Sequence, residues 1–352
     1  MNIFKKKNLV GLDIGSSSIK VVELTQKKRG GRLVFNLNGI GYEPLPPQTI
    51  VEGSIMDFTT LSETINKAFD NAHIKNNSVA ISLSGTAVMT RKMTLQKMDE
   101  AELEESIEFE AKGQFSTPIE NIFYDYDIVS EDEDRMDVVL VAIKKEKVSE
   151  YISAVLQSGK NVEIVDIDHF ALLNSVEYNY SNPPDSAFAI INIGSSMTNV
   201  VIAKNGVPML TRDIAFGGTN FTDIIQKEFH FDFEKAEMIK KGRAVAGVEP
   251  SVIDPSLKML FVDLKGEIDK TFDYYQATSG DEKITKCFLS GGSVKIRNLS
   301  SFLETELSVP IEIINPFQNV FYNEKKFDSE YLNEMENVFG VAVGLAMRKL
   351  GE

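Results

Sequence analysis

A glycine turn preceded by Asp13 lies close to the start of the chain and carries groups suited to binding a phosphate. In the stretch GLDIGSSSIK, residues 11 to 20, an apolar segment runs into Gly15 and then into Ser16, Ser17 and Ser18. The backbone N–H groups and serine hydroxyls of such a turn can hold phosphate oxygens, and the Asp13 carboxylate can face a metal ion or its waters. An ordinary β-hairpin with a solvated aspartate has the same pattern, so this stretch alone leaves both interpretations open.

A second turn of the same kind lies half a chain later. The segment AIINIGSSMTNVVI places Gly194, Ser195 and Ser196 where GLDIGSSSIKVVEL has Gly15, Ser16 and Ser17, at an offset of 179 residues. A motif that recurs at the same place in two successive strand-rich units indicates a duplicated fold. Such a fold can hold one ligand from two sides.

Two glycine pairs in the second half of the chain could also approach a ligand. Gly217 and Gly218 precede an expected helix in AFGGTNFTDIIQKEF, where glycine lets the backbone come close to a bound molecule. Gly291 and Gly292 follow an expected strand in FLSGGSVKIRNL and offer N–H groups and a flat surface for an aromatic ring. A routine strand-to-helix turn would have the same sequence, so the second pair is ambiguous by itself.

Composition narrows the class of protein. The chain has 352 residues, 43% of them hydrophobic and 25% charged, which suits two ordinary globular domains. A formal net charge of -15 argues against a nucleic-acid partner, because phosphate backbones are bound by clustered Lys and Arg. The basic run Lys5, Lys6 and Lys7 is too short to anchor a protein, so we expect a solvated tail or an aid to a membrane contact.

The sulfur and imidazole content excludes several kinds of site. Cys287 is the only cysteine, which rules out an internal disulfide and fits a reducing compartment, so we expect a cytoplasmic protein. The three histidines are far apart in the sequence and no cysteine accompanies them, so no zinc site is expected. No run of about 18 apolar residues predicts a membrane span.

Hydrophobic periodicity predicts two sheet-and-helix units separated by the linker SNPPDS, residues 181 to 186. Each unit begins with a strand, a Gly/Ser turn and two more strands, and a small α/β unit is inserted in the first half. Strands are expected at 9–42 (three of them), 79–83, 87–95, 122–129, 136–143, 162–166, 187–193, 198–203, 206–212 and 284–289, and helices from 99 and at 58–72, 146–158, 233–241, 254–277 and 338–350.

Together these motifs resemble the actin-like ATPase superfamily over the whole chain. GLDIGSSSIK is similar to its first phosphate loop, INIGSSMTN to its second, FLSGGSVKIRNL to its adenosine loop, and FGGTNFT and FGVAVGLAM to its two connecting segments. The small insert after Val79 is similar to that of the FtsA-like branch. The basic start FKKKNLVGLDIGSSSIKVVEL and the segments RDIAFGGTNFTDIIQKEF and FEKAEMIKKG resemble the PilM family of type IV pilus assembly proteins more closely still.

The resemblance implies an α/β, actin-like ATPase fold: two duplicated RNase H-like domains with a small FtsA-type inserted subdomain. Subdomain 1A would comprise residues 1–83 and 163–185, and the insert, subdomain 1C, residues 84–162. Subdomain 2A would comprise residues 186–221 and 284–352, and subdomain 2B residues 222–283.

The resemblance also assigns a site for ATP and magnesium. Asp13 would hold Mg²⁺ through its waters, Gly15 to Ser18 and Lys20 would bind the β- and γ-phosphates, and the second turn would close on them from the other side. Glu237 and Lys240 would touch ribose and adenine, although they would otherwise be the polar face of a helix. The other expected contacts are Gly194, Ser195 and Ser196 to phosphate, Gly217 and Gly218 near the ribose, and Gly291, Gly292, Ser293 and Lys295 to the base.

One position departs from the superfamily pattern. The second phosphate loop normally opens with an aspartate, and this chain has Asn192 there. An amide can accept a hydrogen bond from a metal-bound water, but it cannot take up a proton or supply a negative charge. Either the change is harmless, or the protein holds ATP and hydrolyses it slowly. We favour the second interpretation and expect at most a slow ATPase.

PilM-like proteins are implied to bind ATP and to capture the cytoplasmic N-terminal peptide of PilN in a groove between subdomains 1A and 1C. The expected role is therefore a scaffold at the inner face of the inner membrane, which contacts PilN and other pilus platform proteins and reaches the membrane indirectly. An FtsA-like cell-division protein is the alternative, but this chain ends at AMRKLGE without the amphipathic helix by which such proteins bind membranes. A small-molecule kinase of the superfamily would need a catalytic carboxylate for which the sequence offers no candidate.

Overall fold

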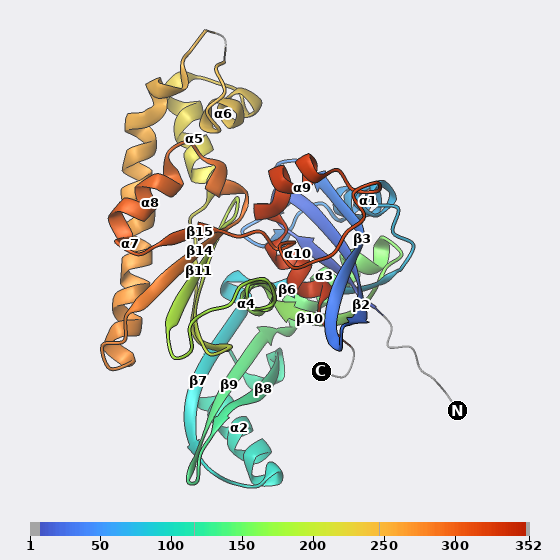
Figure 1. Cartoon of the computed structure of the whole chain (residues 1–352), viewed down its shortest axis with the longest axis vertical. Helices are drawn as coiled ribbons and strands as arrows, with labels where there is room; N and C mark the ends of the chain where they lie inside the picture. The colour runs from blue at the N-terminus through green and yellow to red at the C-terminus, as the bar shows by residue number, and fades with distance from the viewer. Residues whose placement is uncertain (1–7, 116, 246, 350–352) are drawn as a thin grey trace.

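Two five-stranded sheets form the centre of the computed structural model (Figure 1). The structure describes residues 8–115, 117–245 and 247–349. The first sheet has the strand order β10-β6-β1-β2-β3, and the second has the order β13-β12-β11-β14-β15. Their strands are β1 (Val10–Ile14), β2 (Ser18–Arg29), β3 (Arg32–Pro44), β6 (Ser78–Leu83), β10 (Asn161–Ile167), β11 (Ala187–Ile193), β12 (Thr198–Lys204), β13 (Val207–Ile214), β14 (Ile284–Ser290) and β15 (Ile311–Ile313).

The two sheets share one topology. In each, three consecutive antiparallel strands are followed by two strands that add in parallel beside the first of the three. The register places Asp13 opposite Lys20 in the first sheet and Asn192 opposite Asn199 in the second. Both members of the pair keep the offset of 179 residues that the glycine turns show. The duplicated α/β fold expected from the sequence is therefore confirmed.

Helices α4 (Asp168–Asn179) and α10 (Gly340–Ala346) lie between the two sheets. Leu172 and Val176 of α4 share a buried cluster with Ala80 of the first sheet and Phe188 of the second. The helices pack so closely that a Cβ added at Gly344 would overlap the carbonyl oxygen of Ala171. This contact joins the two halves of the duplicated fold.

The sequence did not predict α4, and the packing explains why. His169, Ala171, Leu172, Leu173, Ser175 and Val176 are all buried, so the helix has no exposed face and no amphipathic pattern. A helix of this kind cannot be recognised by a periodicity of 3.6 residues. Its first residues, Asp168 and His169, turn out to matter for the site.

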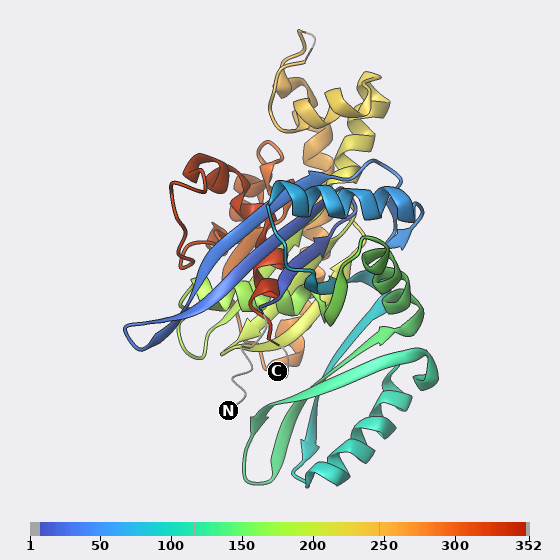
Figure 2. The ribbon, with the colours of Figure 1, turned by 90° about the vertical axis from the view of Figure 1, so that its right-hand side faces the viewer.

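The inserted unit has its own sheet and core (Figure 2). Its strands follow the order β7-β9-β8, and helix α2 (Glu100–Gln114) covers one face of the sheet. Helix α3 (Lys145–Gln157) packs instead in the core of the first sheet, through Val148, Ala154 and Val155. The subdomain boundaries remain a prediction, and this packing favours an insert that ends near residue 144. The strands are β7 (Val88–Gln96), β8 (Ile122–Glu131) and β9 (Arg135–Lys144).

Helices cover the outer faces of both large sheets. Helix α1 (Phe58–Asn71) lies on the first sheet, with Asp57 capping its N-terminus by accepting a hydrogen bond from the N–H of Thr60. On the second half, α5 (Gly218–Phe229), α6 (Phe233–Lys240), α7 (Asp254–Thr278) and α8 (Leu299–Leu307) lie at the upper left of Figure 1, where α7 runs down the left side. They pack in one buried cluster with β11, β12 and β14.

The C-terminal part is divided into shorter elements than the sequence predicted. The expected helix over residues 338–350 is α10 alone, preceded by α9 (Ser329–Met335) and a 3₁₀ turn, Glu336–Val338. Short strands β4 (Ile50–Val51) and β5 (Ser54–Ile55), and also β15, were not expected either, because they are too short to show alternation. The basic run at Lys5 to Lys7 lies outside the described residues. Within the described residues, no helix is long and apolar enough to cross a membrane.

Candidate nucleotide site

The first glycine turn joins β1 to β2 and holds a charged pair. Asp13 and Lys20 face each other across the hairpin, and Lys20 Nζ lies 3.0 Å from Asp13 Oδ2. The N–H of Gly15 closes the turn by donating to Ser18 O over 3.1 Å. A Cβ added at Gly15 would lie 3.1 Å from Lys20 Nζ, so the ammonium group lies next to the turn. Cation, anion and serine hydroxyls therefore occupy one small region.

The second turn joins β11 to β12 in the same way but without charge. The N–H of Gly194 donates to Met197 O over 2.8 Å, which repeats the closure of the first turn. Asn192 Nδ2 donates to Asn199 Oδ1 over 2.9 Å at the positions of Asp13 and Lys20. The second copy therefore has an amide pair where the first copy has an ion pair.

The two turns touch each other across the halves of the molecule. Ser196 Oγ donates a hydrogen bond of 2.9 Å to Ser16 Oγ. Both serines belong to the residues predicted to bind phosphate, one from each copy. Hence the structure brings the two predicted phosphate turns together, although they are about half a chain apart in sequence.

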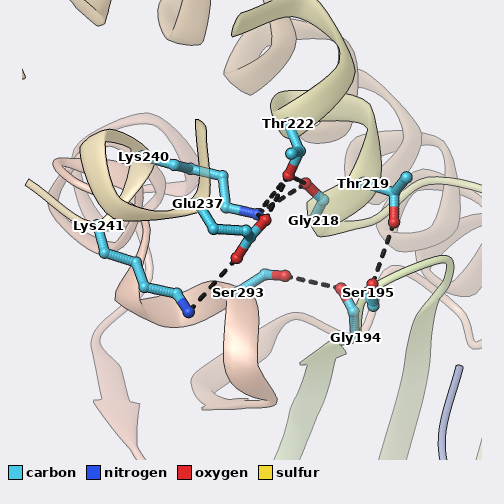
Figure 3. A network of polar contacts seen from close by, with 9 residues as sticks. All are labelled: Gly194, Ser195, Gly218, Thr219, Thr222, Glu237, Lys240, Lys241 and Ser293. Carbon is cyan, nitrogen blue, oxygen red and sulfur yellow. Dashed lines mark hydrogen bonds and ion pairs between the residues drawn. The ribbon is translucent and has the colours of Figure 1, made fainter. Parts of the chain in front are cut away.

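The carbonyl oxygen of Gly194 is the meeting point of three loops (Figure 3). It accepts hydrogen bonds from the N–H of Gly218 at 2.9 Å and from Ser293 Oγ at 2.7 Å. The neighbouring Ser195 contacts Thr219 twice, because its carbonyl accepts from the Thr219 N–H and its hydroxyl lies 3.1 Å from Thr219 Oγ1. The second turn, the Gly217–Gly218 loop and the adenosine loop thus form one hydrogen-bonded unit.

Most of the predicted site glycines are required by this loop packing. A Cβ at Gly217 would lie 2.5 Å from Ser195 O, and one at Gly218 would lie 2.5 Å from Ser293 Oγ. Gly291 has a φ of +95°, and a Cβ there would overlap Ile193 O. Gly292 differs, since a Cβ there would meet only Val338 Cγ1 at 3.8 Å. Gly292 is the exposed glycine of this loop and the one available to a ligand.

Lys240 and Glu237 form a buried ion pair behind the Gly217–Gly218 loop (Figure 3). Lys240 Nζ also donates to Gly218 O at 3.0 Å and to Thr222 Oγ1 at 2.7 Å, so its three protons all have protein acceptors. Burial lowers the pKa of Lys240. Burial raises the pKa of Glu237, but the Lys240 charge and the hydrogen bonds from Lys240 and Thr222 together lower it. In this structure the pair attaches α6 to the start of α5. Its contact with ribose or adenine remains a prediction.

Lys295 lies in the 3₁₀ turn that follows the adenosine loop, Gly292–Lys295. Its ammonium group donates to the backbone oxygen of Glu334, ahead of α10. Partial burial lowers its pKa. The residue is exposed and close in sequence to Gly292, which keeps it a candidate for contact with a base.

Asp168, at the start of α4, was missed in the sequence and lies near Asp13. Ser82 Oγ donates to Asp168 Oδ1 over 2.5 Å. Burial, reinforced by the negative charge of Asp13, raises the pKa of Asp168 to about 6. A carboxyl group with such a pKa can exchange a proton near neutral pH. Because α4 was not recognised, its first residue carried no signal in the sequence.

A second missed group, Asp213 on β13, connects the two halves with the insert. Asp213 Oδ1 accepts from Asn199 Nδ2 at 2.6 Å and lies 3.1 Å from His169 Nε2 of α4. Asp213 Oδ2 accepts from the N–H of Gly85, where the chain enters the insert, at 2.6 Å. Burial lowers the pKa of His169, but Asp213 and the other polar contacts of the ring together raise it. Burial raises the pKa of Asp213, but His169 and the hydrogen bonds from Asn199 and Gly85 together lower it.

The residues present fit a magnesium–nucleotide complex. Mg²⁺ in such sites is held by one or two carboxylates and by phosphate oxygens, with water filling the other positions. Asp13 and Asp168 would supply the carboxylates, and Lys20 would neutralise the phosphates. No group of three His, Cys, Asp or Glu side chains forms a metal site within the described ranges, so the phosphates would have to complete the shell.

The fold agrees with solved structures of actin-like proteins. The PilM-PilN type IV pilus biogenesis complex contains a chain with a TM-score of 0.86 and 27% identity, and the match covers 97% of this chain and 98% of that one. EutJ, an ethanolamine utilization protein from Carboxydothermus hydrogenoformans, has a TM-score of 0.56 at 12% identity and covers 98% and 91%. MreB 5 of Spiroplasma citri bound to AMPPNP has a TM-score of 0.53 at 13% identity and covers 96% and 94%. The last two show likeness of fold alone.

Sequence comparison separates the two families that the motifs resemble. The cell division protein FtsA of Bacillus subtilis is 26% identical over 265 residues, which span 66% of this chain and only 57% of the length of that relative. The FtsA relationship is therefore distant and is not the favoured one. The family model described as type IV pilus assembly protein PilM matches residues 11–350. The chain belongs to the PilM family of type IV pilus assembly proteins.

Proposed function

We propose that the protein is an ATP-binding scaffold of the type IV pilus assembly platform and captures the N-terminal peptide of PilN. The observation that carries the proposal is the meeting of four predicted ligand loops. The first turn reaches the second through Ser16 and Ser196, and the second reaches the Gly217 and adenosine loops through the Gly194 carbonyl. A ligand that touched all four would span the two halves of the fold.

ATP with Mg²⁺ suits this arrangement. We assign the phosphates to the serines of the two turns and to Lys20, Mg²⁺ to Asp13 with Asp168, the ribose to the Gly217–Gly218 side, and the base to Gly292. Bound nucleotide would replace the direct Ser16–Ser196 hydrogen bond by contacts of both serines with phosphate. The nucleotide would then determine the relative orientation of the two halves of the fold.

The proposed scaffold hydrolyses ATP slowly. Asp168 is one carboxylate able to accept a proton, but the position of the second turn that corresponds to Asp13 holds Asn192, which cannot. Asn192 is bonded to Asn199, so the second turn has an amide pair where the first turn has the Asp13–Lys20 ion pair. Slow turnover suits a protein that uses ATP as a structural ligand.

The insert is the proposed docking surface for the PilN peptide. Residues 84–144 contain fifteen Asp and Glu against six Lys and Arg, so the insert has an excess of nine negative charges and suits a basic peptide. Val138, Leu140 and Ala142 of β9 face the core under α2. The alternate residues Phe123, Asp125 and Asp127 of β8 therefore lie on the face away from α2.

This face lies beside α3, which packs against the first sheet, as the proposed groove requires. Phe123 is 53% exposed, and the Lys145 ammonium of α3 lies 5.3 Å from the centre of its ring. An exposed aromatic ring beside two carboxylates can bind apolar and basic side chains of an extended peptide. Because PilN would supply the membrane anchor, we place the protein at the cytoplasmic face of the inner membrane with indirect attachment.

Two binding measurements test the proposal. Labelled ATP is titrated into the protein with and without Mg²⁺, and the fluorescent N-terminal peptide of its PilN partner is titrated separately by anisotropy. We expect both to bind, and we expect Phe123→Ser to weaken peptide binding by at least about tenfold. Phe109→Ser is the matched control, because Phe109 is 75% exposed on α2. Failure of the parent protein to bind the peptide would contradict the scaffold role.

A further inference from the structure

The tip of the β2–β3 hairpin concentrates positive charge in an acidic protein. Residues 25–38 contain Lys27, Lys28, Arg29 and Arg32 and no acidic residue, whereas the whole chain has 52 Asp and Glu against 37 Lys and Arg. Lys27, Lys28 and Arg29 are exposed. Neither Lys27 nor Lys28 has an ion-pair partner among residues 8–115, 117–245 and 247–349. Their charges are therefore available to a ligand.

The placement of these charges does not help the hairpin to form. Lys27 lies opposite Val34 and Lys28 opposite Leu33 in the register, so neither lysine has a carboxylate across the strand pair to stabilise it. The turn between the two strands is Gly30–Gly31, and both residues have positive φ, +57° and +81°, as a two-residue hairpin turn requires. The glycines suffice for the turn, so the basic residues need another explanation.

Apolar side chains accompany the charges at the tip. Leu33 is 54% exposed and lies opposite Lys28. The Arg29 guanidinium lies 4.6 Å from the ring centre of Phe321, which is itself 42% exposed. Figure 2 shows the hairpin extending from the first sheet away from the rest of the molecule. Basic residues around an exposed apolar side chain on a projecting element are typical of a contact with a membrane interface.

We propose that the hairpin tip, residues 27–33, contacts the anionic headgroups of a phospholipid bilayer. Its four cations attract such headgroups, whereas the acidic insert is repelled by them, so the two charged regions would orient the molecule at the surface.

This contact supplements a protein anchor and does not replace it. Each Lys or Arg close to an anionic bilayer strengthens binding about fivefold, so a few cations and one leucine give a weak, reversible association. The proposal concerns orientation at the membrane and stands independently of nucleotide and peptide binding. It adds a direct lipid contact to attachment through a partner.

Co-sedimentation of the full chain with vesicles tests the proposal. The vesicles contain equal parts of phosphatidylglycerol and phosphatidylcholine, with pure phosphatidylcholine as the neutral control. At low ionic strength we expect binding to the anionic vesicles only, and a loss of binding as salt is added. The double variant Lys27→Gln, Lys28→Gln should bind about 25-fold more weakly, since it lacks two cations. Leu33→Ser should weaken binding while keeping its salt dependence.

The matched control is the double variant Lys67→Gln, Lys75→Gln, which removes two exposed lysines from the region of α1 and the loop after it. It should bind the anionic vesicles within about twofold of the parent. Equal binding by the parent and the Lys27, Lys28 variant would overturn the proposal. So would binding of the parent to neutral vesicles, or a hairpin-dependent preference for a single-stranded DNA oligonucleotide over the anionic vesicles.

Discussion

Individual glycines of the adenosine loop serve different needs, although they are neighbours in the sequence. Gly291 is held by the fold, because its φ is +95° and its N–H donates to Asn337 O over 2.7 Å. Gly292 is exposed, with only Val338 near a Cβ placed there. A substitution at Gly292 should therefore change ligand binding, whereas one at Gly291 should change the stability of the fold.

Replacing Gly292 by Val should abolish binding of labelled ATP while the free energy of unfolding changes by less than about 1 kcal/mol, since the loop has room for the side chain. Gly291→Val is the contrasting variant, which should unfold at lower urea concentration because its Cβ would overlap Ile193 O. Normal ATP binding by Gly292→Val would show that the adenosine loop is wrongly assigned.

Asn192→Asp should raise ATP turnover by at least about tenfold, because a positioned acid-base group typically contributes 10²- to 10⁴-fold. ATP affinity should stay within a few-fold of the parent. The new carboxylate would face Asn199 Oδ1, so the double variant Asn192→Asp, Asn199→Lys rebuilds the Asp13–Lys20 pair in the second turn and serves as the matched comparison. A parent turnover of many ATP per minute, unchanged in both variants, would contradict slow hydrolysis.

Binding of Mg²⁺–ATP should depend on pH through Asp168. Its pKa of about 6 means that the carboxyl is mostly protonated at pH 5 and ionised at pH 7, and Mg²⁺ favours the ionised form. Affinity should therefore fall about tenfold from pH 7 to pH 5, and binding at pH 5 should release about one proton per site. Isothermal titration in buffers of different ionisation heat measures that proton. Asp168→Asn should remove the pH dependence of Mg²⁺–ATP affinity. If the dependence stays unchanged in this variant, Asp168 is not the titrating group.

At the scale of secondary-structure elements, the contact between α4 and α10 decides how the two sheets pack. Gly344 lets the two helices touch along their backbones, and Gly11 of β1 lets α10 approach the first sheet in the same way. Helix α10 is buried throughout and α4 is buried over most of its surface, so neither can move aside without opening the core. Stability should be sensitive to a single methyl group here.

Gly344→Ala should lower the free energy of unfolding by about 3 kcal/mol or more, because the added Cβ would overlap Ala171 O and overpacking commonly costs 1–3 kcal/mol. Gly266→Ala in the middle of α7 is the matched control, since nothing lies within 4 Å of its Cβ position. That control should stabilise the protein by about 0.5–1 kcal/mol through helix propensity. Urea unfolding measures both, and equal effects would mean that the helices do not pack as closely as described.

At the scale of the whole molecule, the His169–Asp213 pair joins both halves of the fold to the insert. His169 belongs to α4 between the sheets, Asp213 to the second sheet, and Gly85, bonded to Asp213, to the entry of the insert. Neither ring nitrogen of His169 has a well-aligned hydrogen bond among the described residues, so its contact with Asp213 is an ion pair. The charge on His169 therefore affects how the three parts hold together.

Stability should fall as the pH rises through the raised pKa of His169. The ion pair contributes fully below the unfolded pKa of about 6.5 and is lost when the imidazole deprotonates in the folded protein, above that value. Urea unfolding between pH 6 and pH 9 should show this decline in the parent and a flatter profile in His169→Gln. The Asp168→Asn background separates the two groups, because Asp168 titrates at lower pH. If His169→Gln shows the same dependence of unfolding free energy on pH as the parent, the His169–Asp213 ion pair is not the cause of the decline.

The sequence by itself determined the duplicated architecture and most of the ligand loops. Glycine, serine and proline restrict the backbone locally, so the turns at Gly15, Gly194 and Gly291 and the 181–186 linker were readable from residue type and spacing. The strands of both sheets other than β15 followed from their apolar runs. The family assignment rests on the same motifs in their order along the chain.

Only the tertiary structure decided which groups meet. Helix α4 buries polar residues such as Ser175 and Asn179 beside its leucines, so it shows no amphipathic period in the sequence, and Asp168 and His169 were missed with it. Asp213 gains its role from Asn199, His169 and Gly85, which lie 14, 44 and 128 residues away along the chain. Lys240 and Glu237 are likewise paired with each other and with the Gly218 loop by packing. Such contacts depend on how whole elements pack, and the identity of one residue does not encode its distant neighbours.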